Sequence, residues 1–207
     1  MTKEPPPFGV PAKLRPVARA FFSRPPLTVA REILGCLLVH ESPEGRCVGR
    51  IVEAEAYGVD DPGAHSFRGQ TPRNSPMFER PGLAYVYFTY GMHWLLNAVC
   101  ERPGVPGAVL IRAVEPLEGL ELMRLRRGGV RDLDLCRGPA RLTQAFGVDG
   151  SHNRADLVRR PLFVAPGERL PYEAVEASAR VGLGKAQDHR AWRFYEAGSR
   201  FVSRFIP

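Results

Sequence analysis

The sequence predicts a protein of the mixed α/β (α+β) class, a single domain built on a curved, mostly antiparallel β-sheet with surrounding helices. Apolar runs rich in β-branched and aromatic residues recur along the chain with turn-forming residues between them, a pattern typical of strands joined by hairpins. Other segments have the composition of short helices. The 207 residues show no internal repeat and no linker long enough to divide them, so one domain is expected.

The first part of the chain is expected to lead from an irregular arm into a hairpin. Residues 1–26 are rich in proline and lack the apolar core of a secretory signal, so we expect a loose arm. Residues 26–35 have a helical composition and end in Gly35, a favoured residue just after a helix. Apolar runs within 36–57 flank a turn containing proline and glycine, which predicts a β-hairpin. Residues 58–76 are rich in turn-forming residues and predict a loop.

The remaining elements continue the alternation of strands and short helices. Residues 83–99 are aromatic and β-branched and are interrupted by Gly91, so two strands around a tight turn are expected. Further strands are expected at 107–116, 161–168 and 190–198, and helices at 117–127 and 138–147.

The charge balance favours a polyanionic partner. The formal net charge is +7 and the sequence pI is near 9.6. Almost all of the positive charge is arginine, whose guanidinium group binds phosphates through two parallel hydrogen bonds. A solvated surface also explains many basic sequences, so basicity alone is weak support for nucleic-acid binding. No apolar stretch reaches the roughly 18 residues of a transmembrane helix.

The cysteines and histidines suggest no metal centre. The four cysteines are far apart and form no CxxC pair, so we expect reduced, mostly buried thiols. The five histidines have no HxxxH or HExxH spacing, so a zinc or iron site has no support.

Two glutamates stand at alternate positions of the second hairpin strand. Residues two apart in a strand share a face, so Glu53, Glu55 and Tyr57 should point the same way. From the pattern alone, a solvated face with exposed carboxylates is the favoured interpretation. The alternative is a catalytic carboxylate at a strand end, beside an aromatic ring.

The glycine turn within 83–99 carries large side chains. Tyr90 and Met92 flank Gly91, and the tip of a tight hairpin protrudes from its sheet, where such side chains are hard to bury. An apolar wedge on an arginine-rich protein is a device for unstacking base pairs.

Six blocks in order along the chain resemble one family. They are "IVEAEAY", "AHSFRGQTPRN", "YVYFTYGMHW", "VLIRAVEPLEG", "LCRGPARL" and "ARVGLG" followed by "RAWRFY". This pattern is similar to the alkyladenine (methylpurine) DNA glycosylases, from about Leu27 to the C-terminus. The resemblance implies a catalytic domain over 27–207, a fold like the C-terminal domain of formyltransferases, and a monomer without metal or cofactor.

The resemblance also implies the catalytic residues. Glu55 matches the family's general base, which deprotonates the water that attacks C1′ of a flipped nucleotide. Glu53 matches a neighbouring glutamate without that role. Arg112 matches an arginine near the water and the flipped nucleotide's phosphate, and the carbonyl group of Val181 would be a second ligand of the water.

A base pocket is implied around these residues. Tyr57, His65 and Tyr87 match the side chains that sandwich the extruded base. Backbone groups around Gly63 and His65 would bond to the purine edge. Asn97 matches an asparagine that disfavours the 2-amino group of normal guanine.

Contacts with the duplex are implied at two kinds of residue. Tyr90, with Met92 beside it, matches the wedge that fills the gap left by the flipped base. Arg68, Arg73 and Arg141 are candidates for contacts with the DNA backbone. Arg141 stands at the expected start of a helix, where its charge and the helix N-terminus could both hold a phosphate.

The expected function is a monofunctional DNA glycosylase of base excision repair that acts on double-stranded DNA containing damaged purines. Three alternatives remain: a non-catalytic binder of damaged or distorted DNA, a bifunctional glycosylase-lyase, and a hydrolase of free nucleotides. A lyase needs an amine, and no lysine lies between Lys13 and Lys185. A free nucleotide needs no wedge. The expected location is the cytoplasm, on nucleoid DNA, in a prokaryote, or the nucleus in a eukaryote.

Overall fold

The computed structural model describes residues 10–11, 13–184 and 189–203, and these residues form a curled antiparallel sheet with helices around it. The strands are β1 (Leu37–Ser42), β2 (Gly45–Tyr57), β3 (Ala84–Thr89), β4 (His93–Val99), β5 (Ala108–Glu118), β6 (Leu162–Ala165), β7 (Val175–Ser178) and β8 (Arg193–Glu196). The α-helices are α1 (Pro26–Glu32), α2 (Leu120–Arg126) and α3 (Pro139–Phe146). The predicted class, a single α+β domain on a curved antiparallel sheet, is confirmed.

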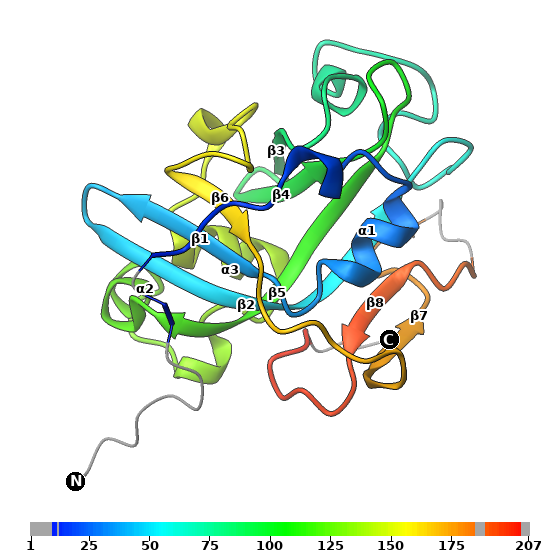
Figure 1. Cartoon of the computed structure of the whole chain (residues 1–207). Coiled ribbons are helices and arrows are strands. Elements are labelled where there is room, and N and C mark those ends of the chain that lie inside the picture. The colour runs from blue at the N-terminus through cyan, green and yellow to red at the C-terminus, as the bar shows by residue number, and fades with distance from the viewer. Residues whose placement is uncertain (1–9, 12, 185–188, 204–207) are drawn as a thin grey trace, which may run out of the picture.

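Strand β2 is the centre of the sheet. The strand order is β3-β4-β5-β2-β1-β6, and every pair among the described strands is antiparallel. One edge of β2 pairs with β5 along most of its length, while the other edge pairs first with β1 and then, at residues 53–55, with β8. This branching curls the sheet (Figure 1).

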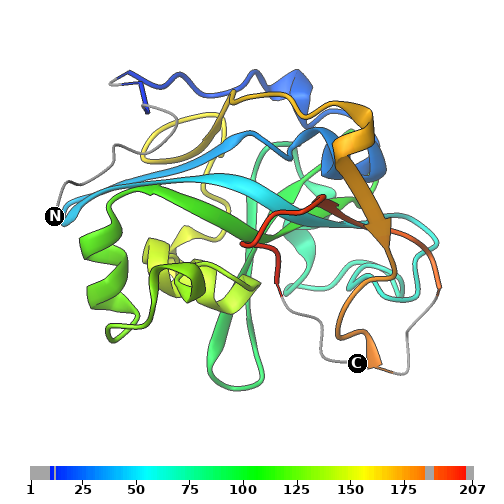
Figure 2. The ribbon, with the colours of Figure 1, turned by 90° about the horizontal axis from the view of Figure 1, so that it is seen from below.

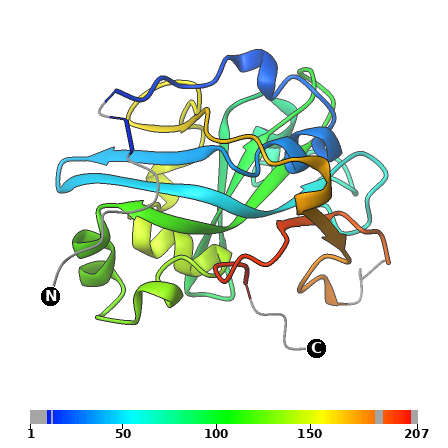
Figure 3. The same cartoon turned by 60° about the horizontal axis from the view of Figure 1, so that its bottom comes forward.

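The β3–β4 hairpin projects away from the rest of the sheet, at the bottom of the view in Figure 2. Helices α2 and α3 lie together below the ribbon of β1 and β2 (Figure 3). Helix α3 also contacts the hairpin close to its tip, since the side-chain oxygen of Thr143 donates to the carbonyl oxygen of Trp94 at 2.7 Å.

Three irregularities interrupt the pairing of β2 with β5, and the two near the middle of β2 compensate each other. Ile51 is opposite Val114 and Glu53 is opposite Ala113, so Val52 is an extra residue of β2. Ala54 is then opposite Ile111, which leaves Arg112 as an extra residue of β5. A β-bulge of this kind exchanges the faces to which the following side chains point.

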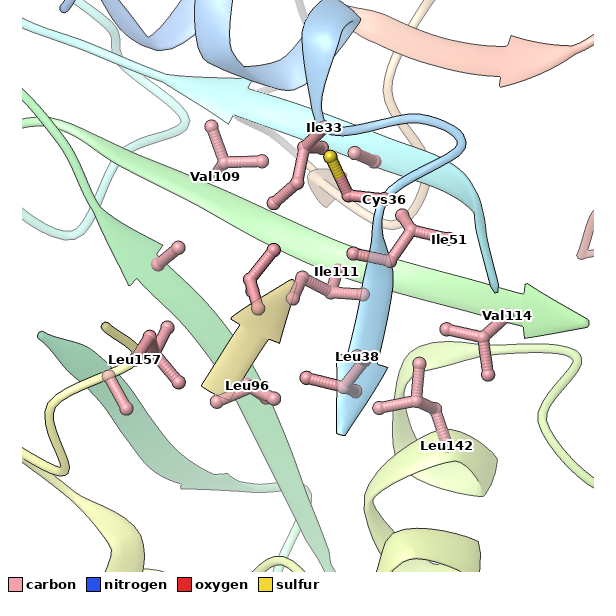
Figure 4. Close-up of a cluster of buried hydrophobic side chains, with 14 of the residues drawn as sticks. Ile33, Cys36, Leu38, Ile51, Leu96, Val109, Ile111, Val114, Leu142 and Leu157 are labelled. Atoms are coloured by element: carbon pink, nitrogen blue, oxygen red, sulfur yellow. The ribbon is translucent and has the colours of Figure 1, made fainter. Parts of the chain in front are cut away.

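The bulges keep one face of the sheet apolar along its whole length. Ile51 lies before the bulge in β2 and Ala54 lies after it, yet both belong to the main core. Figure 4 shows part of this core, to which Ile33 just after α1, Ile111 from β5 and Leu142 from α3 contribute. The opposite face of β2 is therefore left to Glu53, Glu55 and Tyr57.

The proline-rich arm is not loose where the structure describes it. Leu14, Val17 and Phe22 are buried, and the backbone N–H of Val17 donates to the carbonyl oxygen of Val164 in β6. The expectation of a loose arm is therefore wrong for residues 13–26. Most of this segment has no regular secondary structure, but its apolar side chains pack against the sheet.

The predicted helices and strands are found at their expected places, with differences at the edges. The first helix ends at Glu32, and Gly35 has the positive φ of 84° expected of a helix-ending glycine. The sequence analysis missed β7, because Val175–Ser178 is a short, half-exposed edge strand without an apolar run. It also missed the short 3₁₀ helices, which lie at Arg19–Phe21, Ser75–Phe78, Asp132–Asp134, Gly150–His152 and Tyr172–Ala174.

Candidate active site

A cavity of about 410 Å³ lies on the face of the sheet opposite the main core. Strands β2 to β5 form its floor, and its walls come from the loop after β2, the first turn of α3 and the segment after β7. Its volume is in the range of small-ligand pockets. The predicted site residues that line it are Tyr57, Gly63, His65, Tyr87, Tyr90, Asn97, Arg112 and Val181.

Glu55 lies immediately behind this lining. Its side chain is fully buried, and its three polar partners all line the cavity. Oε1 accepts a hydrogen bond from the backbone N–H of Val181 at 2.8 Å, and Oε2 accepts one from the hydroxyl of Tyr57 at 2.8 Å. Nη1 of Arg112 is 3.2 Å from Oε2. The contact with Val181 is made by its amide nitrogen, whereas the sequence analysis assigned a role to its carbonyl group.

Glu53 is the centre of a second buried cluster. Its Oε1 accepts hydrogen bonds from Nε of Arg112 at 2.8 Å and Nε of Arg193 at 2.6 Å. Both the hydroxyl and the backbone N–H of Ser203 also donate to this carboxylate. Burial favours a higher pKa, but the two arginines and the hydrogen bonds outweigh it, so the pKa of Glu53 lies below its ordinary value.

The interpretation of a solvated carboxylate face is wrong. Glu53 and Glu55 do share a face, as the alternation predicts, but neither is exposed. Arg112 lies between them, and the bulge in β5 places it there. Burial lowers the pKa of Arg112, and its two glutamate neighbours raise it by more, so this guanidinium remains charged. Burying both carboxylates is possible because buried arginines neutralise them.

Three aromatic rings stand over the cavity floor. Burial raises the pKa of Tyr57 well above its ordinary value, and the charge of Glu55 raises it further, so Tyr57 remains protonated and able to donate. The rings of His65 and Tyr87 are 4.5 Å apart between centroids, at an angle of 69°. Burial, together with the charge of Arg73, lowers the pKa of His65, which is therefore neutral near pH 7. The predicted aromatic residues are thus brought together.

The orientation of His65 depends on two residues that the sequence analysis did not assign to the site. The hydroxyl of Tyr85 lies 2.8 Å from Nδ1 of His65. Asn74 is buried in the loop, and its side-chain amide donates to the carbonyl oxygens of His65 at 2.7 Å and Gly69 at 3.0 Å. The loop is therefore held by a local amide, and its composition only indicated a turn.

Asn97 lies on the cavity floor, as predicted. It is buried in β4 opposite Tyr85, and its side-chain N–H donates to the carbonyl oxygen of Tyr85 at 3.0 Å. This hydrogen bond fixes the orientation of the amide.

The hairpin tip presents two exposed apolar side chains beside the cavity. Tyr90 is 80% exposed and Met92 is 69% exposed. Tyr90 and Gly91 both have positive φ values, 51° and 67°, which form a tight turn that matches the twist of the strands. A positive φ is uncommon for a residue with a bulky side chain. The turn therefore holds the Tyr90 side chain away from the sheet.

Comparisons with known proteins identify the family. The model of the family described as "Methylpurine-DNA glycosylase (MPG)" matches residues 20–200. The chain belongs to this family. It is 49% identical over 205 residues to the "Putative 3-methyladenine DNA glycosylase" of Salinibacter ruber, with 94% of this chain and 99% of the relative covered.

Two further relatives carry the same name. The protein of Burkholderia cenocepacia is 49% identical over 195 residues, with 92% of each chain covered. That of Rubrobacter xylanophilus is 49% identical over 170 residues, covering 82% of this chain and 87% of the relative. The resemblance drawn from the six blocks is therefore confirmed. The family match begins at residue 20, within the segment that the sequence analysis separated as an arm.

The candidate DNA-backbone residues of this methylpurine-DNA glycosylase family member lie around the cavity rather than in it. Arg68 is exposed on the loop after β2. Arg73 is exposed on the same loop, where Nη2 donates to the carbonyl oxygen of Phe88 at 3.1 Å. Arg141 is half-exposed in the first turn of α3, and its Nη1 is 3.7 Å from a carboxylate oxygen of Asp134. Their role in DNA contact stays a prediction.

The other predictions of the sequence analysis concern cysteines, metals and membranes. All four cysteines are unpaired and buried, as predicted. Among the described residues, no group of three or more His, Cys, Asp or Glu side chains is placed to hold a metal ion. None of the helices in the described part of the chain has the length and hydropathy needed to cross a membrane.

Proposed function

We propose that this chain is a monofunctional DNA glycosylase that flips alkylated or deaminated purines out of double-stranded DNA and hydrolyses the N-glycosidic bond. Membership of the methylpurine-DNA glycosylase family supports the DNA glycosylase activity and DNA as the substrate. The observation that carries the mechanism is the carboxylate of Glu55, which is buried directly behind a cavity and held by three groups that line it.

In this proposal Glu55 is the general base. A carboxylate offers about four acceptor positions, and its contacts with Tyr57, Arg112 and Val181 leave one for a water molecule. The water oxygen attacks C1′ while its proton passes to Glu55, and the bonding electrons of the C1′–N bond leave with the purine. The carboxylate also stabilises the positive charge that develops on the sugar.

The cavity would hold the flipped base. The rings of Tyr57, His65 and Tyr87 supply stacking surfaces, and the Asn97 amide meets the purine edge. A neutral His65 adds no charge that would repel a cationic alkylpurine. Because the relatives are bacterial, we propose that the protein acts on nucleoid DNA. We also propose that it acts as a monomer, as the family resemblance implied.

The proposal is tested by base release from duplexes that each carry one damaged purine: 3-methyladenine, 7-methylguanine, hypoxanthine or ethenoadenine. Release of at least one free base, with an abasic site left behind, is expected. A protein that binds these duplexes but releases no base from any of them would instead be a non-catalytic damage binder.

Tyr90→Ala should weaken excision most for lesions in stable base pairs. Flipping a base costs a few kcal/mol, and a wedge offsets part of this cost by filling the gap. If the wedge contributes about 1.4 kcal/mol, excision at subsaturating enzyme falls about tenfold. Single-turnover rates on paired and mismatched lesions measure the effect. Tyr172→Ala is a matched control, since Tyr172 is 78% exposed and does not line the cavity. Equal losses of excision by Tyr90→Ala on paired and mismatched lesions would contradict the wedge role.

Arg141→Ala should reduce the salt dependence of duplex binding. Each neutralised phosphate contributes roughly 0.9 to the slope of log affinity against log salt, so the slope should flatten by about one unit. The family resemblance also implied that Arg112 lies near the phosphate of the flipped nucleotide, but two carboxylates hold Arg112 in the structure. Arg169→Ala is the control, because Arg169 is exposed and does not line the cavity of the candidate site. An unchanged slope for Arg141→Ala would place this residue off the DNA path.

Borohydride should trap no covalent adduct between the protein and damaged DNA. A lyase mechanism needs an amine that forms a Schiff base with the sugar, and the chain between Lys13 and Lys185 contains no lysine. The test is to incubate the protein with borohydride and a duplex that carries a lesion it excises, and to separate the products by denaturing electrophoresis. A cross-linked band in good yield would contradict the monofunctional assignment.

A further inference from the structure

Asp61 and Arg180 form a buried ion pair at the edge of the cavity. Both side chains are fully buried, and the two groups meet through two contacts. In one of them Nη2 of Arg180 donates to Oδ1 of Asp61 at 2.7 Å. The two residues are 119 positions apart in the sequence. The pair therefore ties the loop after β2 to the segment after β7.

Each member of the pair contacts or adjoins a group of the proposed site. Nη1 of Arg180 donates to the carbonyl oxygen of Ala56 at 2.9 Å, between Glu55 and Tyr57 in β2. The same guanidinium lies 4.6 Å from the centre of the Tyr57 ring. Arg180 directly precedes Val181, whose N–H donates to Glu55.

Asp61 extends the same linkage to the base pocket. Its Oδ1 accepts a hydrogen bond from the backbone N–H of Gly63 at 2.9 Å. Gly63 lines the cavity, and a side-chain carbon there would come within 3.0 Å of Nη2 of Arg180 and of Leu183. The loop backbone thus lies directly against the ion pair.

Stability alone does not account for such a pair. The cost of removing two charges from water often cancels their attraction, and apolar residues of similar volume can replace buried ion pairs without loss of stability. The planar guanidinium instead fixes the directions of several partners at once. Here the partners are Asp61, the backbone of β2 and the ring of Tyr57.

We propose that Asp61 and Arg180 are positioning residues, which hold the amide of Val181, the ring of Tyr57 and the amide of Gly63 in the arrangement that base excision requires. This role rests on the proposed function of Glu55. Neither residue touches the reacting atoms. Loss of the pair releases the segment that carries Val181, so that Glu55 keeps its charge but loses the fixed geometry of its donors.

The test compares the two single variants with the double variant Asp61→Leu/Arg180→Met in the full-length chain. Each single change leaves one buried charge without its partner, so both should lower the melting temperature. The double variant removes both charges and should recover most of that loss. Its single-turnover excision rate should nevertheless remain at least tenfold below the parent, while its affinity for lesion duplex stays within about threefold.

A second pair serves as the matched control. Arg24 and Glu32 form an ion pair at 2.8 Å, and neither lines the cavity. The variant Arg24→Met/Glu32→Leu should excise at the parental rate. Arg180→Lys keeps the positive charge but lacks the planar guanidinium, so its excision rate should also fall while its affinity for lesion duplex is retained. If the double variant does not fold, Arg180→Lys tests the positioning role.

The outcomes separate the inference from the proposed function. Parental excision by a folded double variant, or by Arg180→Lys, would overturn the positioning role while leaving the glycosylase assignment intact. Absence of excision by the parent protein would overturn the assignment itself. The emission of Trp192 provides a further readout, since its ring lies 5.1 Å from the Arg180 guanidinium. Its spectrum should change in Arg180→Met but not in the control.

Discussion

Glu55→Gln is expected to abolish base release while binding of lesion-containing duplex is retained. The amide has nearly the size of the carboxylate but cannot take a proton from water. General-base catalysis typically contributes about 10²–10⁴-fold, and loss of the charge that stabilises the sugar cation adds to this. Binding should persist or tighten slightly, because phosphate contacts and the aromatic rings are unchanged and one negative charge is removed. Single-turnover excision and equilibrium binding measure the two effects.

Glu121→Gln is the matched control for this variant. It removes one carboxylate from α2, where the side chain is 87% exposed, and should excise at the parental rate. The catalytic assignment would be wrong if Glu55→Gln released the base within about tenfold of the parent rate, well below the usual contribution of a general base.

Glu53→Gln should have the largest effect on stability. Arg112, Arg193 and the backbone N–H of Ser203 all donate to this carboxylate in a buried environment. Removing one partner of a buried ion pair typically costs about 3–5 kcal/mol. For a protein of this size that corresponds to a fall in melting temperature on the order of 10 °C. Thermal unfolding at pH 7 measures it.

The base-release rate of the same variant distinguishes the two glutamates. Only one partner of Glu53, Arg112, lines the cavity, whereas all three partners of Glu55 do. Measured well below the melting temperature, excision by Glu53→Gln should therefore fall much less than excision by Glu55→Gln. The opposite order would make Glu53 the better candidate for the general base.

The difference in stability between the parent and Glu53→Gln should also depend on pH. The folded-state pKa of Glu53 lies below its ordinary value of 4.5, so its contribution is complete above that value and is lost as the pH falls through the lower, folded-state pKa. The melting temperatures of the parent and Glu53→Gln should therefore converge below about pH 4.5. A constant gap between pH 7 and pH 3 would show that the lost contribution does not come from the charge.

The sequence pattern predicted most elements, and the family resemblance assigned eight of the residues that line the cavity, for identifiable reasons. Strand alternation correctly placed Glu53 and Glu55 on one face, and Gly91 marked the hairpin turn. Burial of the two carboxylates could not be predicted, because the arginines that neutralise them lie on other strands. Arg112 is 59 positions and Arg193 140 positions from Glu53.

The missed residues share the same cause. Asp61 and Asn74 were part of a loop whose polar composition indicated only turns, and Arg180 stood in a segment without a regular pattern. Their roles depend on partners brought close by folding, as the 119-residue separation of Asp61 and Arg180 illustrates. Local composition carries no information about such contacts.

The paired bulges at Val52 and Arg112 limit where residues can be inserted into or deleted from this chain. They change which residues of β2 face the core: the odd-numbered side chains do so before the bulge, and the even-numbered ones do so after it. Deleting Val52 would undo this change, turning Glu53 and Glu55 toward apolar neighbours and Ala54 toward the cavity. Insertions or deletions near Val52 should therefore be poorly tolerated. The spacing along this strand is a stricter requirement than the identity of most side chains on it.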